Sequence, residues 1–108
     1  MIYNPDKWMV LEINHNDEKF YRVFASWAGS YLEGQSWRMG TKVSSITEEG
    51  DYLIFRNESG SVYKCHKETY GACGYTASVL ANMIDQAEGH TITPLYQNTD
   101  WNDLINKE

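Results

Sequence analysis

Short apolar runs separated by tight turns fill the first two thirds of this 108-residue chain, and they constrain its fold more than any other feature. The runs are rich in β-branched and aromatic residues, and the clusters between them contain Asn, Asp, Gly and Ser, which is typical of strands joined by hairpins. The strands predicted in this way are residues 7–13, 19–27, 41–47, 52–56 and 61–66. Apolar residues occur on both faces of the first and fourth strands, so the sheet must be covered on both sides or curl into a small barrel. We therefore predict an antiparallel, strongly twisted or barrel-like sheet of about five strands.

One helix is predicted in the second half of the chain, at residues 75–88. Its apolar residues recur with helical spacing and form a single stripe, which should pack on the sheet. The stripe consists of Val79, Leu80, Met83, Ile84 and Ala87. Gly89 is suited to end this helix. The predicted class is therefore α+β.

The end of the chain is expected to be extended and then irregular. Pro94 confines segment 91–96 to a sheet edge, and such an edge could pair two copies of the chain. Residues 97–108 are expected to form an acidic tail with a short helical turn at 101–106. The length fits a single domain over residues 1–108.

The formal net charge of −6 argues against a binder of duplex nucleic acid, which needs a basic surface. The charge is compatible with a protein partner that has a basic face. We expect no membrane span, because no run of about 18 apolar residues occurs. Two cysteines without a secretory leader indicate a reducing cytosol.

The cysteines and histidines are candidates for a metal site or a disulfide. The candidates for zinc are His15, Cys65, His66, Cys73 and His90, but their spacing fits no common zinc pattern, so no metal is expected. A disulfide between Cys65 and Cys73 is geometrically feasible across a short loop. A reducing compartment favours two small buried hydrophobic residues instead.

Cys73 directly precedes the predicted helix, and a helix N-terminus can make a thiol reactive. A thiol-dependent enzyme would also need a base such as His66 or His90 nearby. No established catalytic motif is present, so we expect no enzyme and no cofactor.

The glycine-containing turn at the same place offers a second hypothesis. Backbone amides at the start of a helix can hold a phosphate or another anion. The residues of such a site would be Gly71, Gly74, Tyr75 and Thr76. The simpler interpretation, that the glycines only permit a tight turn, is favoured.

Segment 26–39 is the most informative part of the sequence. It combines Gly and Ser with the residue types that dominate binding interfaces, namely Trp27, Tyr31, Trp37 and Arg38. For either Trp taken alone, a core position is favoured. Residues 28–40 are expected to form a long loop or a bulged strand, and for segment 26–39 as a whole a binding role is favoured.

Several stretches of the chain resemble a pattern found in small, uncharacterised accessory proteins of tailed bacteriophages. They are 21–39 (YRVFASWAGSYLEGQSWRM), 49–52 (EGDY), 59–67 (SGSVYKCHK) and 70–71 (YG). The resemblance extends over residues 7–85. It implies expression in the cytoplasm of an infected bacterium, and it supplies no catalytic residues.

These observations lead to one favoured function and two alternatives. The favoured function is a non-enzymatic phage accessory protein that binds a host or bacterial defence protein, in host takeover or counter-defence. The first alternative is a sponge for a nucleotide-like ligand, with Arg38 and the glycine turn on the phosphate and Tyr31 or Trp37 stacked on the base. The second alternative is a small thiol-dependent enzyme that uses Cys73.

Overall fold

The structure is a computed structural model that describes residues 1–29 and 34–105. In this part of the chain, strands form two sheets and two helices pack against them. The strands are β1 (Ile2–Tyr3), β2 (Lys7–His15), β3 (Glu18–Trp27), β4 (Ser36–Met39), β5 (Val43–Glu49), β6 (Tyr52–Asn57), β7 (Val62–His66) and β8 (Thr91–Pro94). The helices are α1 (Gly74–Gln86) and α2 (Trp101–Ile105).

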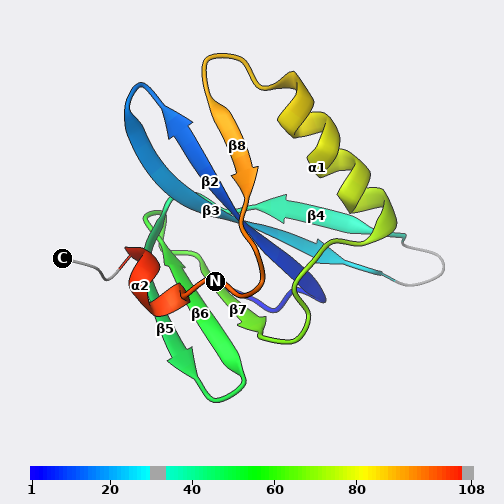
Figure 1. The fold of residues 1–108 in the computed structure, drawn as a ribbon. Coiled ribbons are helices and arrows are strands. Elements are labelled where there is room, and N and C mark those ends of the chain that lie inside the picture. The colour runs from blue at the N-terminus through cyan, green and yellow to red at the C-terminus, as the bar shows by residue number, and fades with distance from the viewer. Residues whose placement is uncertain (30–33, 106–108) are drawn as a thin grey trace.

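Each of the two sheets has four strands. Sheet A has the order β1-β7-β6-β5, and sheet B has the order β4-β3-β2-β8. The described pairings between these strands are antiparallel except the one between β1 and β7. An isolated parallel bridge also joins Trp8 to Tyr70. Sheet B lies between two other layers, with α1 on one side and sheet A on the other (Figure 1).

This arrangement confirms the α+β class and corrects its detail. We predicted one sheet of about five strands that curls toward a barrel, whereas the structure has two separate sheets and no closed barrel among the described residues. A sheet whose strands have two apolar faces can bury both faces if it closes into a barrel or if other layers cover it on both sides. Here sheet B is covered by layers on both faces.

The β2–β3 hairpin is the longest pairing of the fold. It runs from Lys7↔Ser26 to His15↔Glu18, and its two-residue turn is formed by Asn16 and Asp17. Both turn residues have positive φ, 51° and 67°, which is the type I′ geometry that suits the twist of hairpin strands. The turn that the sequence predicts between these strands is therefore confirmed.

The first hydrophobic core lies between the two sheets and is centred on Trp8. The indole Nε1 of Trp8 donates to the carbonyl of His66 at 2.6 Å, and its ring meets the ring of Tyr70 edge to face at 4.7 Å. The Tyr70 hydroxyl donates to the Leu95 carbonyl at 2.6 Å and accepts the amide of Val10. These bonds satisfy the polar groups of the buried Trp8 and the partly buried Tyr70, which would otherwise be costly to desolvate.

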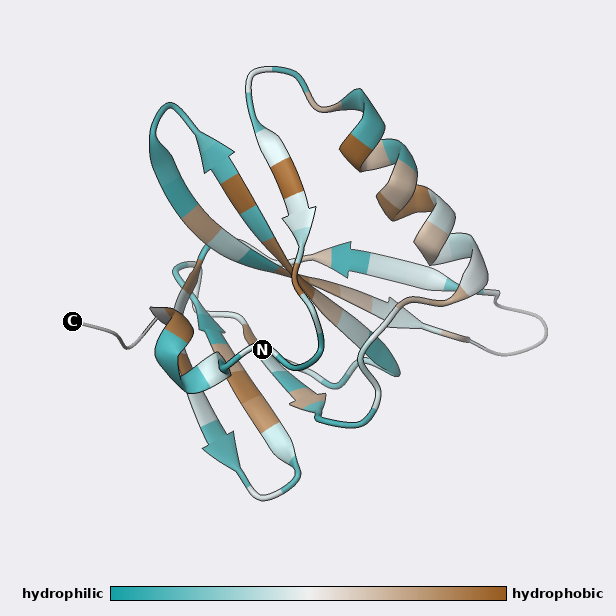
Figure 2. Cartoon of the chain, in the orientation of Figure 1, coloured by the Kyte–Doolittle hydropathy of each residue, from teal (hydrophilic) through white to brown (hydrophobic). Residues whose placement is uncertain are grey.

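The second core lies between sheet B and α1. Leu80 of the helix is buried with Leu11, Ile13 and Phe24 of the sheet. The predicted stripe is largely confirmed, since Val79, Met83 and Ile84 are partly buried against this cluster. The hydrophobic residues of α1 alternate with hydrophilic ones along the helix (Figure 2).

Two parts of the fold differ from their predicted form or were not predicted, and a third is confirmed. Residues Ser36–Met39 form the regular strand β4, within a stretch that we expected to be a loop or a bulged strand. The two-residue strand β1 was not predicted, because its parallel pairing with β7 joins residues 60 positions apart. The edge position of the Pro94 segment is confirmed, since β8 pairs with β2 at one edge of sheet B.

Candidate functional site

Strand β4 carries two of the predicted binding residues on its opposite faces. Trp37 pairs with Ser26, whereas Arg38 pairs with Ala25. Consecutive residues of a strand point to opposite sides of the sheet. Trp37 therefore faces the layer of α1, and Arg38 faces the layer of sheet A. The two side chains do not form the joint surface that a shared binding site would require.

Trp37 is exposed, but it is also held in place. Its ring stacks on Phe24, with ring centroids 5.6 Å apart and an interplanar angle of 21°. Phe24 is fully buried, so one face of the indole rests on a rigid neighbour. The side chain is nevertheless 39% exposed, so the core position favoured for Trp37 taken alone is wrong. An exposed aromatic residue that is already ordered loses little conformational entropy when it binds.

A hydrogen bond joins the chain just before β4 to the first turn of α1. The side-chain oxygen of Gln35 accepts the backbone N–H of Tyr75 at 2.8 Å. The beginning of β4 lies beside the first turn of α1 (Figure 1). Tyr75 itself is 57% exposed. We call Gln35, Trp37 and Tyr75 the aromatic surface.

Arg38 and Trp27 belong to a different cluster, at the other face of β4. The Arg38 guanidinium carbon lies 4.7 Å from the centre of the Tyr3 ring, in cation–π geometry. Tyr3 stacks on the buried Tyr63 at 5.0 Å and meets Trp27 edge to face at 6.3 Å. The Trp27 indole donates to the Asn4 carbonyl at 3.1 Å. Trp27 thus ties the N-terminal segment to the sheet, as the core interpretation of this residue expects.

The ionisation of Tyr63 reflects this environment. Burial raises the pKa of its phenol, and the Arg38 guanidinium, which is hydrogen-bonded to it, opposes that rise. Arg38 therefore already has a π-face and a phenol oxygen as partners. A phosphate would have to compete with both of them.

The predicted anion-binding turn is largely engaged within the chain. The Tyr75 amide is taken by Gln35, and the Gly71 amide donates to the Trp8 carbonyl at 2.8 Å. Thr76 is buried, and its hydroxyl donates to the Cys73 carbonyl. This geometry fits the interpretation that the glycines serve the turn. Tyr31, the remaining predicted site residue, lies outside the described residues.

The cysteines are free thiols, so the disulfide alternative is not formed. Cys65 is fully buried, and this burial raises its thiol pKa strongly. Cys73 is partly buried at the start of α1. The imidazoles weighed as its base have other neighbours, since His66 packs on Tyr52 and His90 lies beside His15.

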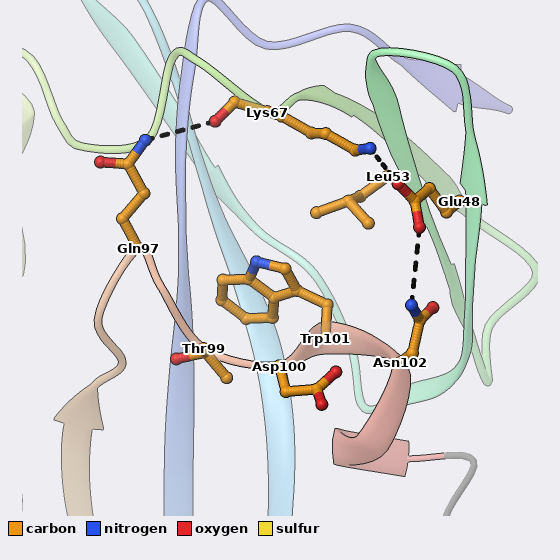
Figure 3. Close-up of a pocket in the computed structure, with 8 residues that line it drawn as sticks. All are labelled: Glu48, Leu53, Lys67, Gln97, Thr99, Asp100, Trp101 and Asn102. Carbon is orange, nitrogen blue, oxygen red and sulfur yellow. Dashed lines mark hydrogen bonds and ion pairs between the residues drawn. The ribbon is translucent and has the colours of Figure 1, made fainter.

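The cavity shown in Figure 3 lies beside α2. Its volume is about 330 Å³, near the lower end of the range for small-molecule sites. It is lined by Glu48, Leu53, Lys67, Gln97, Thr99, Asp100, Trp101 and Asn102. Lys67 is ion-paired with Glu48, which also accepts a hydrogen bond from Asn102. These two bonds and the charge of Lys67 lower the pKa of Glu48. Because its cation is already paired, this cavity offers little to a phosphorylated ligand.

No protein-family model, curated protein or solved structure matches this chain. Among residues 1–29 and 34–105, no group of three or more His, Cys, Asp or Glu side chains could hold a metal ion. No helix in the same part of the chain is long and apolar enough to cross a membrane.

Two of the three members of the aromatic surface have a signal in the sequence, each for a different role. Trp37 was predicted as a binding residue, whereas Tyr75 was assigned to the anion-binding turn through its backbone. Gln35 had no sequence signal, because its bond to Tyr75 spans 40 positions.

Proposed function

We propose that this protein is a non-enzymatic binding protein that docks on another protein through its aromatic surface. The observation that carries the proposal is the state of Trp37, which is 39% exposed and at the same time stacked on the buried Phe24. Trp and Tyr are the residue types that contribute most often to the centres of protein interfaces. Rigid aromatic anchors of this kind bind with a small entropic cost.

A protein partner is a better fit for this surface than a small ligand. Trp37 lies on strand β4 and Tyr75 on helix α1, and the cavities beside α2 are lined by other residues. Arg38, which the nucleotide alternative places on a phosphate, lies on the opposite face of β4. The net charge of −6 favours a partner with a basic face.

The biological setting is part of the proposal and rests on the resemblance to phage accessory proteins. In that setting the partner is a host or bacterial defence protein in the cytoplasm of the infected cell. Binding that blocks such a protein requires no catalytic residue.

The test is a pull-down from bacterial lysate with three tagged proteins. They are the wild type, Trp37→Ala and Tyr96→Ala. Tyr96 is a matched control, because it is an aromatic residue that is 81% exposed and lies after β8, outside the aromatic surface. A partner kept by wild type and Tyr96→Ala but lost by Trp37→Ala supports the proposal. The affinity of Trp37→Ala for the purified partner should be about 30-fold or more below that of the wild type. This is the loss expected when an interface residue that contributes about 2 kcal/mol to the binding free energy is truncated.

A further variant and a check of folding keep the test decisive. Tyr75→Ala alters an exposed side chain, so its loss of binding cannot be ascribed to the Phe24–Trp37 stack. Circular dichroism must show that each variant is folded. A partner that is lost with Tyr96→Ala and retained by both aromatic-surface variants would place the binding site elsewhere and refute the proposal.

A further inference from the structure

Two histidines that play no part in the aromatic surface lie next to each other at one end of sheet B. His15 is the last residue of β2, and His90 directly precedes β8. The centres of their rings are 6.3 Å apart, and the ring planes are inclined at 71°. His15 is exposed and His90 is partly exposed, so solvent reaches the pair.

The strand register explains why these side chains meet. The last pair between β2 and β8 is Asn14↔Thr91, and His15 and His90 stand one position beyond it on their two strands. In an antiparallel pair, directly opposite residues point to the same side of the sheet. Both imidazoles therefore project from one face, and the backbone ladder fixes their spacing.

The hydrogen bonding of His90 selects the ring nitrogen that is free to bind. Its Nδ1 lies 3.1 Å from the carbonyl oxygen of Glu88. A carbonyl can only accept, so in the neutral ring Nδ1 must carry the proton. The lone pair is then on Nε2. A backbone carbonyl on the other ring nitrogen is the usual support of a histidine that binds a metal.

The spacing of the rings is close to that of two imidazoles that share one ion. With metal–nitrogen distances of about 2.0–2.1 Å and ligand angles of about 90–120°, the ring centres of such a pair stand roughly 4.5–5.5 Å apart. Rotation of two solvent-accessible side chains about their χ angles covers the difference from 6.3 Å. Glu18, the cross-strand neighbour of His15, is ion-paired with Lys42 at 3.4 Å.

From these observations we infer that His15 and His90 together chelate a divalent late transition-metal ion, with water completing its coordination. Neutral imidazole is a ligand that suits Ni²⁺, Cu²⁺ and Zn²⁺. The net charge of −6 raises the local concentration of cations. The site has two protein ligands, fewer than the sets of three or more that a closed metal centre requires. This inference is independent of the proposed function, because it uses none of the residues of the aromatic surface.

His66 provides a matched control within the same chain. Its Nδ1 accepts the N–H of Glu68 at 3.1 Å, and its ring packs against Tyr52 rather than against another histidine. A single imidazole cannot chelate. Replacing His66 should therefore leave the binding of the ion unchanged.

The experiment is a titration with Ni²⁺ at pH 7.5, followed by isothermal calorimetry. It compares the wild type with His15→Ala, His90→Gln and His66→Gln. We expect saturable binding to the wild type and to His66→Gln. Each of the other two variants should bind at least about tenfold more weakly, because the second ligand is held at a high effective concentration only when both are present.

A thermal melt with and without Ni²⁺ gives a second readout. Because an ion bound to the folded state stabilises that state, it should raise the melting temperature of the wild type and not of His15→Ala or His90→Gln. The inference is overturned if the wild type does not bind. It is equally overturned if His66→Gln loses as much Ni²⁺ affinity as His15→Ala and His90→Gln do. The same holds if His15→Ala and His90→Gln bind Ni²⁺ as tightly as the wild type.

Discussion

Gly40 offers a sharp test of how the two sheets face each other. It follows β4, and a Cβ atom added there would lie 2.7 Å from the side-chain nitrogen of Asn57 and 2.8 Å from Cε2 of Tyr63. Both neighbours belong to sheet A and are buried. The variant Gly40→Ala therefore inserts a methyl group between the sheets where no space exists.

The size of the effect follows from what can move. Ordinary contact begins at 3.4 Å, so the neighbours must retreat by about 0.6–0.7 Å. The Tyr63 ring is stacked on Tyr3 at 5.0 Å. The backbone at Gly40 is fixed too, because its amide donates to Val23 and its carbonyl accepts from Arg22. Overpacking of this kind costs about 1–3 kcal/mol. The lower entropy of the unfolded chain with alanine offsets about 0.4–1 kcal/mol of that cost.

The assay is denaturant unfolding of Gly40→Ala, followed by tryptophan fluorescence. We expect a net loss of roughly 1–2 kcal/mol in the free energy of unfolding, and a melting temperature lower by roughly 5–10 °C. Gly74→Ala is the matched control, because its added Cβ would meet nothing within 4 Å at the start of α1. The control should be neutral or stabilising by up to about 1 kcal/mol. Equal stability of Gly40→Ala and the wild type would show that β4 does not pack against Tyr63, and would refute the described arrangement of the sheets.

Three further outcomes are expected. Ellman's reagent should modify Cys73 in the folded protein and reach the buried Cys65 only on unfolding, and two thiols that react at equal rates would contradict the burial of Cys65. Because burial raises the phenol pKa of Tyr63 and Tyr70, their contribution to stability is complete below the unfolded pKa near 10 and is lost as pH rises through the folded values. Unfolding measured from pH 9 to 11.5 should therefore show falling stability, with late ionisation of two tyrosines at 295 nm. Trp101→Ala should cost about 2–4 kcal/mol, because this partly buried ring contacts Trp8, Phe55 and Tyr70, and a cost below 0.5 kcal/mol would mean that α2 is not anchored.

The parts of the fold that depend on local patterns could be predicted from the sequence. The β2–β3 hairpin follows from two apolar runs around a short turn of Asn and Asp. Helix α1 follows from a stripe with helical spacing, and its predicted range of 75–88 differs from Gly74–Gln86 only at the ends. The edge position of β8 follows from Pro94, which cannot donate to a neighbouring strand.

The division into two sheets could not be predicted in the same way. Strands with two apolar faces are compatible with a barrel and with covered layers, and the choice depends on contacts between distant residues. One of these is the bond from the Trp8 indole to the His66 carbonyl, which spans 58 positions. Another is the parallel pairing of β1 with β7, for which two residues give no sequence pattern.

For segment 26–39, the sequence predicts which residue types could bind a partner, but not the side of the sheet to which each side chain points. Had Ser36–Met39 been recognised as a strand, alternation alone would have separated Trp37 from Arg38. The glycines of this segment favoured a loop instead. Gly29 in fact has a φ of +73°, and a Cβ atom there would lie 1.6 Å from the Gly34 carbonyl oxygen. It therefore marks a close approach of the backbone next to a regular strand.

The aromatic content of the chain has a consequence for function once the two cores are known. Fifteen large aromatic residues exceed what one small core can hide, and this excess predicts exposed rings. The fold provides a core on each side of sheet B, and these two cores absorb most of the excess. Among the described residues, the large exposed aromatic side chains are Trp37, Tyr75 and Tyr96. Two of these three belong to segments that the Gln35 side chain joins. Because the fold had the capacity to bury so many other rings, the exposure of these two is a stronger indication of a binding surface than aromatic composition alone.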